Sequence, residues 1–383
     1  MATDTVMAST VVAKGLEGVI VAESKIGFID GQKGVLIYRG HNIHDLVPNC
    51  TYEEVAYLLL YGQLPNQAQL VEFKNQLAPH FVLPAVTIEF LKGLPRDAVP
   101  MAVLRTAISS VSFNDPDAEE LDLDRARQKG IKLIAASAAI TACFDRIRKG
   151  LSVVAPDPAL KGVAEQYLYM LNGHRASDVF ARALDVYFIL LAEHGFNAST
   201  FTARCVISTL SDVYSAITAA IGSLKGPLHG GANEAAMDML LEIGNVENTE
   251  SYIRKALEEK RKIMGFGHRV YKTEDPRSTH LRKMASEMAR ENKKMAGWYA
   301  IQQKVESLMD QEKGIKSNVD FYSATVLTAL GIDHDLFTPL FAVARMAGWT
   351  AHIVEQLADN RLIRPRCQYV GSVNLPVPPL AAR

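Results

Sequence analysis

The feature that most constrains this sequence is helical periodicity, which continues with few interruptions from near residue 51 to the C-terminal tail. The first helical segment illustrates it. Thr51-Tyr-Glu-Glu54 matches a capping box, in which side chains satisfy the free amides at a helix start. Leu58 and Leu59 then supply an apolar face, and Gly62 ends the segment. A chain with this pattern throughout is predicted to be almost entirely helical.

Further helices are predicted from apolar spacing and from start and stop residues. They cover residues 100–111, 124–148, 177–194, 199–224, 232–243, 249–263, 276–292 and 298–312, then a segment starting near 320 and one over 337–358. The small residues within Ile131–Ile140 favour close packing on a neighbouring helix, for which a partner subunit is a candidate. The proline-rich tail from Arg361 to Arg383 is predicted to be irregular.

Strand signals are confined to the N-terminal part of the chain. Val19-Ile-Val21 and Val35-Leu-Ile-Tyr38 are rich in β-branched residues, and Asp30-Gly31 and Gly34 lie between them. This arrangement predicts a short N-terminal β-hairpin. The expected fold class is therefore all-α, with one small β-element.

Length and charge narrow the possible functions. A chain of 383 residues exceeds one typical core and is long enough for two domains. Its 48% hydrophobic and 22% charged residues are ordinary for a globular protein. The net charge of -1 creates no overall field that would attract nucleic acid or an anionic membrane. We expect neither as a partner, so any anion must be recognised locally.

Cysteine usage and the N-terminus bear on location. The cysteines form no CxxC pair and therefore predict neither a zinc site nor a disulfide framework; they are Cys50, Cys143, Cys205 and Cys367. Met1–Thr10 carries no secretory signal, and we expect a cytoplasmic protein. Cys205–Leu224 is the strongest candidate for a membrane span, but Asp212 within it favours a buried helix.

Three stretches each place one polar side chain in a glycine-rich or apolar setting. They are Gly226-Pro-Leu-His-Gly-Gly-Ala-Asn-Glu234, Met264-Gly-Phe-Gly-His-Arg-Val-Tyr-Lys272 and Asn318-Val-Asp-Phe-Tyr322. Their candidate catalytic residues are His229, His268 and Asp320. Two imidazoles and a carboxylate suffice to remove a proton beside a carbonyl group and to polarise that carbonyl.

Each of these residues also has a structural interpretation. Asp320 could be the N-cap of the helix that follows it. His229 could be a buried histidine bonded to backbone, and His268 could belong to a surface basic cluster with Arg269 and Lys272. A motif by itself does not decide between these alternatives.

The three stretches in this order, followed by Asp275-Pro-Arg277, resemble the citrate synthase family, and the resemblance runs from Gly15 to about Gly371. It implies a two-domain helical fold. Residues 1–230 and 336–383 would form a large domain, and residues 231–335 a small one that carries His268, Arg277 and Asp320. A cleft that closes on substrate would lie between them.

The resemblance also implies roles for these residues. Asp320 would remove a proton from the methyl group of an acyl thioester. His229 would donate a hydrogen bond to the thioester oxygen. His268 would hydrogen-bond the ketone oxygen of the second substrate. The resemblance further assigns Arg269 and Lys272 to the phosphates of coenzyme A.

A dicarboxylate substrate calls for arginine forks, and the resemblance implies four ligands: His194, Arg277, Arg345 and, across a dimer interface, Arg364. Structural alternatives exist for each. Arg277 and Arg364 neighbour prolines and could be plain loop residues. His194 could interact with the end of a helix dipole. Arg345 lies within an apolar helix, where an unpaired guanidinium is costly.

The activity that the resemblance implies is condensation of acetyl-CoA with oxaloacetate, followed by hydrolysis of the citryl thioester. The alternative acyl donor is propionyl-CoA, as in 2-methylcitrate synthase, and a non-catalytic helical scaffold is the less favoured alternative. We expect a homodimer or a higher homo-oligomer, no permanently bound cofactor and no metal. His41 and His44 could face one metal ion, but no third ligand is evident nearby.

Overall fold

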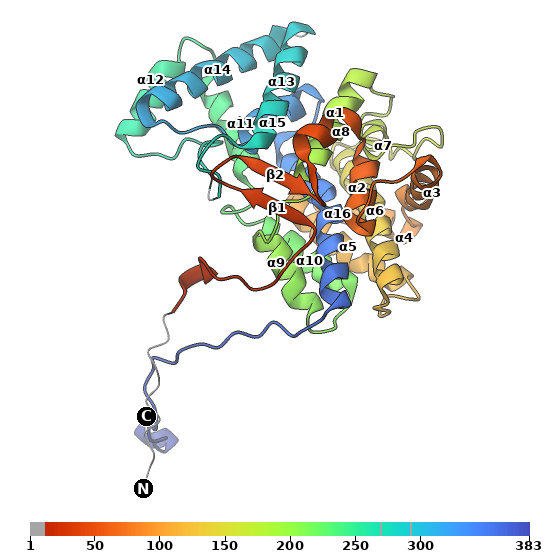
Figure 1. Cartoon of the computed structure of the whole chain (residues 1–383), viewed down its shortest axis with the longest axis vertical. Helices are drawn as coiled ribbons and strands as arrows, with labels where there is room; N and C mark the ends of the chain where they lie inside the picture. The colour runs from red at the N-terminus through yellow and green to blue at the C-terminus, as the bar shows by residue number, and fades with distance from the viewer. Residues whose placement is uncertain (1–11, 269, 292) are drawn as a thin grey trace.

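The computed structural model describes residues 12–268, 270–291 and 293–383. It is predominantly helical, as predicted, and several of its helices pack around one central helix, α16 (Figure 1). The first ten helices are α1 (Ile43–Asn49), α2 (Tyr52–Tyr61), α3 (Gln67–Leu77), α4 (Ala85–Lys92), α5 (Pro100–Ser110), α6 (Leu123–Arg148), α7 (Val163–Asn172), α8 (Asp178–Leu191), α9 (Ala198–Ile207) and α10 (Val213–Leu224).

The later helices are α11 (Ala232–Ile243), α12 (Thr249–Glu258), α13 (Pro276–Glu291), α14 (Lys293–Lys313), α15 (Val319–Ala329) and α16 (Phe337–Ala358). Short 3-10 turns lie at η1 (Lys14–Leu16), η2 (Ala78–Phe81), η3 (Val111–Asn114), η4 (His334–Leu336) and η5 (Leu380–Ala382).

Helix α16 is the centre of the core. Its side chains are buried without a break from Phe337 to Val354, and it packs against α2, α6, α8, α9 and α10. It approaches α6 closely, because a Cβ atom at Gly130 would lie 2.1 Å from Thr350 Cγ2. The small-residue stretch of α6, which follows Gly130, is buried except for Lys132. Its neighbour is thus a helix of the same chain, and not the partner subunit that the sequence suggested.

Helices α11 to α15 form a second group, at the upper left of Figure 1, and pack mainly on one another. Contacts of α11 with α16, and of α13 and α15 with α8, join this group to the first. The first sequence motif lies between α10 and α11, the second precedes α13, and the third opens α15. All three motifs therefore lie where the two groups of helices meet.

The predicted hairpin is present, but its first strand was misplaced. β1 (Gly27–Asp30) pairs antiparallel with β2 (Val35–Tyr38), with Gly27 opposite Tyr38, and β3 (His41–Asn42) adds a third strand. Val19-Ile-Val21 forms no strand. Ile20 is 91% exposed, so these β-branched residues have no surface to bury against. Strand propensity without burial does not make a strand.

The predicted helix over 199–224 is two helices. α9 ends at Ile207, and α10 begins at Val213, where Asp212 Oδ1 accepts a hydrogen bond from Ser215 N at 2.9 Å. Leu210, between them, has a φ of 63°. Helix-capping polar residues such as Asp212 end one helix and begin the next, although the apolar pattern continues across residues 199–224.

The second and third motifs are joined through their backbones. Asn318 N donates to Gly265 O at 2.9 Å, and Phe266 forms an antiparallel bridge with Ser317. Gly265 has a φ of 80°, and a Cβ atom there would lie 2.7 Å from Phe321 Cβ. Only glycine allows this turn to approach the start of α15 so closely.

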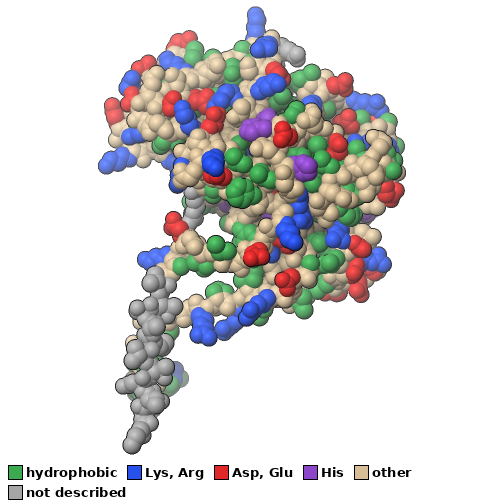
Figure 2. Space-filling model, in the orientation of Figure 1, with side chains coloured by type: hydrophobic (Ala, Val, Ile, Leu, Met, Phe, Trp, Pro, Cys, Tyr) green, Lys and Arg blue, Asp and Glu red, His purple; other side chains and the backbone are tan. Residues whose placement is uncertain are grey.

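The molecular surface mixes charges of both signs. Figure 2 shows acidic and basic side chains interspersed over the viewed face, without a large area of one sign. Among the described residues, no helix combines the length and the apolar character that crossing a membrane requires.

Replacing Gly265 by alanine is expected to lower the free energy of unfolding by about 2 kcal/mol or more, because strain at positive φ adds to overlap with Phe321. The control is Gly297→Ala. Gly297 lies in α14, where an added Cβ atom would have no neighbouring atom within 4 Å, and alanine there should stabilise by roughly 0.5–1 kcal/mol. Thermal or denaturant unfolding measures both variants. Equal stability of G265A and the wild type would contradict the close approach.

Candidate active site

The turn between α10 and α11 presents His229. Gly230 N donates to Leu224 O at 3.0 Å, and a Cβ atom at Gly230 would lie 2.4 Å from that oxygen. The turn therefore requires glycine next to the histidine. His229 N donates to Gly226 O at 2.9 Å and closes the turn.

Hydrogen bonds from α9 set the tautomer of His229. Ser199 N lies 3.2 Å from His229 Nε2, and Ser199 Oγ lies 2.8 Å from the same nitrogen. A backbone N–H can only donate, so Nε2 accepts and the proton of a neutral ring is on Nδ1. Trp349 Nε1 donates to Ser199 Oγ at 3.1 Å. Asn197 Oδ1 lies 2.8 Å from the same Oγ, so the single hydroxyl hydrogen is shared between this oxygen and His229 Nε2, and the backbone N–H of Ser199 is what fixes the tautomer. The ring thus presents Nδ1–H as a donor.

His268 is fixed in the opposite tautomer by its own loop. Its Nδ1 accepts from Val270 N at 3.0 Å and from Tyr271 N at 3.2 Å. The proton of the neutral ring is therefore on Nε2. The ring of His194 lies edge-on to it, with centroids 5.4 Å apart, and His194 Nε2 is 3.1 Å from Tyr271 Oη. Two predicted histidines from distant parts of the chain meet here.

Asp320 lies in the first turn of α15 but is not its N-cap. Asn318 is the cap, since its Oδ1 accepts from Asp320 N at 3.0 Å. Asn318 Nδ2 also donates to Gly267 O at 2.9 Å, which ties the helix start to the second motif. The capping alternative for Asp320 was thus wrong, and its carboxylate is free for another use. Burial raises the pKa of this carboxyl to about 6, against the lowering effect of Arg277.

Arg277 is buried in a paired state. Its Nε and Nη2 donate to the two carboxylate oxygens of Asp275 at 2.9 and 2.8 Å. Asp275 Oδ2 also accepts a hydrogen bond at 3.1 Å from the backbone N–H of Val319, the residue before Asp320. Burial alone would lower the pKa of Arg277, and the Asp275 carboxylate outweighs it and raises that pKa. This pair fixes Arg277 and the start of α15 together.

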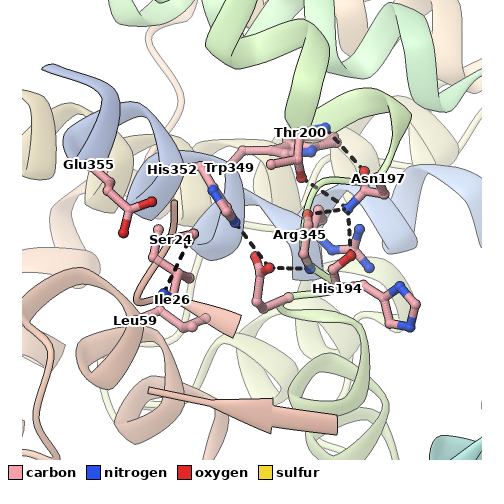
Figure 3. A network of polar contacts seen from close by, with 12 residues as sticks. Ser24, Ile26, Leu59, His194, Asn197, Thr200, Arg345, Trp349, His352 and Glu355 are labelled. Atoms are coloured by element: carbon pink, nitrogen blue, oxygen red, sulfur yellow. Dashed lines mark hydrogen bonds and ion pairs between the residues drawn. The ribbon is translucent and has the colours of Figure 1, made fainter. Parts of the chain in front are cut away.

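Arg345 is buried without a carboxylate partner among the described residues. It is 1% exposed, its Nε donates to Leu191 O at 2.6 Å, and its guanidinium carbon lies 4.8 Å from the centroid of the Phe341 ring. Burial lowers its pKa to about 10. Figure 3 shows it beside His194, whose pKa it helps to lower. The remaining N–H groups form a fork suited to a carboxylate ligand.

A polar network supports this pocket from α9 and α16 (Figure 3). Arg204 Nη1 lies 3.1 Å from His352 Nδ1 and can only donate, so His352 Nε2 donates to Glu193 Oε1 at 3.0 Å. Arg204 also pairs with Glu355 at 2.8 Å. Glu193, which is fully buried, directly precedes His194. The network thereby anchors the end of α8 against α16.

The electrostatics keep the three histidines neutral. Burial, followed by the charge of Arg345, lowers the pKa of His229 to about 4. Burial, followed by the charge of Arg277, lowers the pKa of His268 to about 4. The pKa of His194 is lowered well below its usual value, by burial and then by both arginines. The site therefore offers uncharged donors beside two fixed cations.

The remaining predicted residues lie elsewhere. Lys272 is exposed and lines a cavity of about 210 Å³ beside His268, together with Lys316 and Asn318. Arg269 lies outside the described residues. Arg364 is exposed in the extended tail after α16 and forms no hydrogen bond or ion pair within the described chain. A single chain therefore does not bring Arg364 to the histidines.

Of the two histidines considered as a metal pair, His44 contacts a histidine of another helix. His44 Nδ1 lies 2.8 Å from His280 Nε2, a residue of α13. Within the described ranges no three His, Cys, Asp or Glu side chains gather as a metal site would require.

Five residues that orient the site were not predicted from the sequence: Glu193, Asn197, Ser199, Tyr271 and Asp275. Tyr271 lies within the second motif, and Asp275 follows that motif by three residues. Their closeness to His268 in the sequence could have identified them as residues of the site. Ser199 was taken only as a helix start, where polar residues are common. Its contact with His229 depends on the packing of α9 against the turn, which no local pattern records.

Comparison with known proteins gives consistent results. The family model described as "Citrate synthase, C-terminal domain" matches residues 15–366. The chain is 50% identical over 362 residues to citrate synthase 2 of Bacillus subtilis, covering 94% of this chain and 95% of the relative. It is 44% identical over 380 residues to 2-methylcitrate synthase 2 of Corynebacterium glutamicum, covering 98% and 99%.

A solved structure is also similar. It is a ternary complex of carboxymethyl coenzyme A and oxaloacetate with citrate synthase from Thermoplasma acidophilum. The TM-score is 0.92 at 34% identity, and the match covers 97% of this chain and 99% of that one.

At pH 6 the rings of His229 and His268 are expected to be neutral, because both pKa values are lowered to about 4, whereas a free histidine titrates near 6.5. Side-chain ¹⁵N NMR over pH 3–8 measures this. Arg345→Gln should raise the pKa of His229, which Arg345 acts upon, and leave that of His268 in place. If both rings titrate near pH 6.5 in the wild type, burial and the neighbouring arginines do not lower their pKa values, and the expectation is wrong.

Proposed function

The chain belongs to the citrate synthase family, and we propose that it condenses acetyl-CoA with oxaloacetate and hydrolyses the citryl thioester to citrate and coenzyme A. In class it is an acyltransferase of the tricarboxylic acid cycle. The observation that carries this proposal is the meeting of two neutral, oppositely oriented imidazoles with a raised-pKa carboxyl and a buried arginine that lacks a carboxylate partner within the described chain. The Thermoplasma relative, solved with a coenzyme A derivative and oxaloacetate, supports the substrate pair.

The first step is proton removal. Asp320 takes a proton from the methyl group of the acetyl thioester, and Nδ1–H of His229 donates to the thioester oxygen on which negative charge develops. A carboxyl with a pKa of about 6 is a stronger base than an ordinary carboxylate and is still deprotonated at neutral pH. Its partner imidazole, being neutral, donates a hydrogen bond without repelling the arginines.

The second step forms the carbon–carbon bond. The enolate carbon attacks the ketone carbon of oxaloacetate, and Nε2–H of His268 donates to the ketone oxygen as it becomes an alkoxide. The proton that Asp320 removed balances the alkoxide charge and ends on the hydroxyl of the product. Arg277, Arg345 and His194 bind the two carboxylates and hold the ketone in place. Water then cleaves the thioester, with its hydroxyl going to the acyl carbon and its proton to the leaving thiolate. No metal or permanently bound cofactor is needed for these steps.

Coenzyme A would enter from the small-domain side. Lys272, at the mouth of the cavity beside His268, and Arg269 would face its phosphates. We propose that residues 231–335 form a small domain that closes over the large one, built from residues 1–230 and 336–383, since the catalytic residues come from both helix groups. The four free cysteines support the reducing cytoplasm as the location.

The acyl donor has a second candidate, propionyl-CoA, because relatives of both activities match nearly the whole chain: citrate synthase 2 of Bacillus subtilis is 50% identical and 2-methylcitrate synthase 2 of Corynebacterium glutamicum is 44% identical. One methylene changes pocket discrimination by only about 1–3 kcal/mol. Thiol release with oxaloacetate and each thioester, measured side by side, decides between them. Absence of release with both would favour the scaffold alternative.

Asp320→Asn should lower kcat by about 10²-fold or more, because it removes the general base and keeps the shape. Binding of oxaloacetate, followed by its effect on the melting temperature, should persist, because Arg277 and Arg345 are unchanged. A variant that keeps more than about a tenth of wild-type kcat would mean that another group is the base.

The C-terminal tail after α16 bears on whether the chain forms a dimer. After α16 the chain leaves the body as an extended segment (Figure 1), and its apolar side chains are exposed, with Val370 at 89% and Val377 at 82%. Such surface favours cover by another chain. We propose a homodimer in which Arg364 of each chain completes the dicarboxylate site of the other.

Arg364→Ala and Asp320→Asn chains, each inactive alone, should therefore complement each other. A mixed dimer has one site with both defects and one with neither, so random 1:1 exchange should restore about a quarter of wild-type activity. Native mass spectrometry confirms the exchange. Mixed dimers without activity would show that Arg364 does not serve the neighbouring site.

A further inference from the structure

Two buried polar atoms near Asp320 have no hydrogen-bond partner in the described part of the chain. They are Tyr187 Oη, from α8, and Asn233 Nδ2, from the first turn of α11. Both side chains are 0% exposed. Leaving a buried donor unsatisfied is costly, so such groups are rare and call for an explanation.

The orientation of the Asn233 amide is fixed. Its Oδ1 accepts from Glu234 N at 2.9 Å, so the unpartnered end is the NH₂ group, which can only donate. A phenolic oxygen can accept one hydrogen bond and donate another. The two unpartnered atoms are therefore chemically complementary to each other, with one hydrogen of Tyr187 left to donate.

The surroundings of Tyr187 place that hydrogen beside the proposed base. Helix α8 packs against both α15 and α16. Burial is the main cause of the raised pKa of the Tyr187 phenol, and the next is the negative charge of Asp320. The Asn233 side chain, which lies near enough to act on the phenol as a hydrogen-bond partner although no bond of full geometry is formed, and the charges of Arg345 and Arg277 act in the opposite direction. Tyr187 thus lies among the catalytic groups but on the large-domain side, whereas Asp320 belongs to the other group of helices.

Asp320 itself lacks such a partner. Its backbone is held by Asn318, but its carboxylate accepts no hydrogen bond from the residues that the structure describes. A base needs one oxygen free for the substrate proton and gains by having the other held, because misplacement of a reacting group by about 1 Å can cost about 10²-fold in rate.

We propose that Tyr187 is a positioning residue for Asp320. When the two helix groups close on substrate, the phenol donates its hydrogen to the carboxylate oxygen that does not take the substrate proton, while the Asn233 amide donates to the phenolic oxygen. The chain Asn233–Tyr187–Asp320 satisfies both unpartnered atoms at once. The phenol keeps its proton throughout. This inference rests on the proposed role of Asp320 as the base.

The test is Tyr187→Phe, which removes only the hydroxyl. Its matched control is Tyr167→Phe. Tyr167, in α7, is also fully buried and its hydroxyl is likewise without a partner in the described chain, but the charges that act on it are those of Asp145, Arg148, Asp333 and Asp335, away from the site. Both variants are assayed for thiol release, for melting temperature and for the pH dependence of kcat.

Y187F is expected to lose about 10- to 100-fold in kcat, the range set by a hydrogen bond to a charged group. Its melting temperature should be no lower than that of the wild type, because the lost hydroxyl was unsatisfied. The acidic limb of its kcat profile should move up by about one pH unit, since a hydrogen bond to the charged form lowers a carboxyl pKa and its loss raises it.

The other charged groups that act on Asp320 are Arg277, Asp275 and Lys262, and none is altered in Y187F. The change in the acidic limb therefore reports the lost hydroxyl. Y167F should match the wild type in kcat and in pH dependence, and its melting temperature should also be no lower.

Several outcomes would overturn the inference. If Y187F matches Y167F in kcat and pH profile, the hydroxyl has no role in catalysis. A rise only in KM for the acyl thioester would make Tyr187 part of the acyl pocket instead. A melting temperature below that of Y167F would show that the hydroxyl is already satisfied. Absence of thiol release by the wild type would instead contradict the proposed function, so the two failures are distinguishable.

Discussion

Two guanidinium groups in a dry pocket are the constraint on which the rest of the site depends. Arg277 has its counter-charge in Asp275, whereas Arg345 forms no ion pair within the described chain. Its Nε donates to a backbone carbonyl, its guanidinium faces Phe341, and the charge of Glu193 acts on it from beyond ion-pair distance. Burying an uncompensated ion costs on the order of several kcal/mol, which is why burial lowers the pKa of Arg345. The same field acts on the histidines. Each imidazole beside these arginines stays neutral, and a neutral imidazole can donate a hydrogen bond to an oxygen that gains charge.

Hydrogen bonds from backbone amides fix the tautomers of His229 and His268, and Ser199 also contacts His229 through its hydroxyl. Each neutral ring therefore presents one N–H group as a donor in a fixed direction. His268 receives two N–H groups on Nδ1, and His229 receives one on Nε2, so the two rings present opposite nitrogens. The loop that carries His268 also contains the amides that orient it. Two glycines of these motifs are required by space, as the contacts of Gly230 with Leu224 and of Gly265 with Phe321 show.

What the sequence did not reveal depends on packing between distant segments. Helical periodicity of apolar residues located the central helix α16 correctly. The same periodicity continued through the break between α9 and α10, and it therefore did not predict that break. In the hairpin, burial rather than β-propensity selected Gly27–Asp30 over Val19–Val21. At the site, Ser199 meets His229 from 30 positions away and Tyr271 meets His194 from 77. No local spacing encodes those contacts.

Several buried polar groups without a hydrogen-bond partner lie at the site, although Tyr167, Thr218, Arg282 and Trp298 also carry such atoms in the described chain. Beneath the site, a buried chain of polar residues from Glu355 to Glu193 is closed by hydrogen bonds at nearly every atom. At the site, Tyr187, Asn233, one oxygen of Glu193 and the fork of Arg345 lack partners within the described residues. Apolar residues of similar volume could replace these polar side chains without loss of stability, since such replacements often stabilise a core. Their retention at the junction of the two helix groups is explained if substrate supplies the missing charge and closure supplies the missing hydrogen bonds.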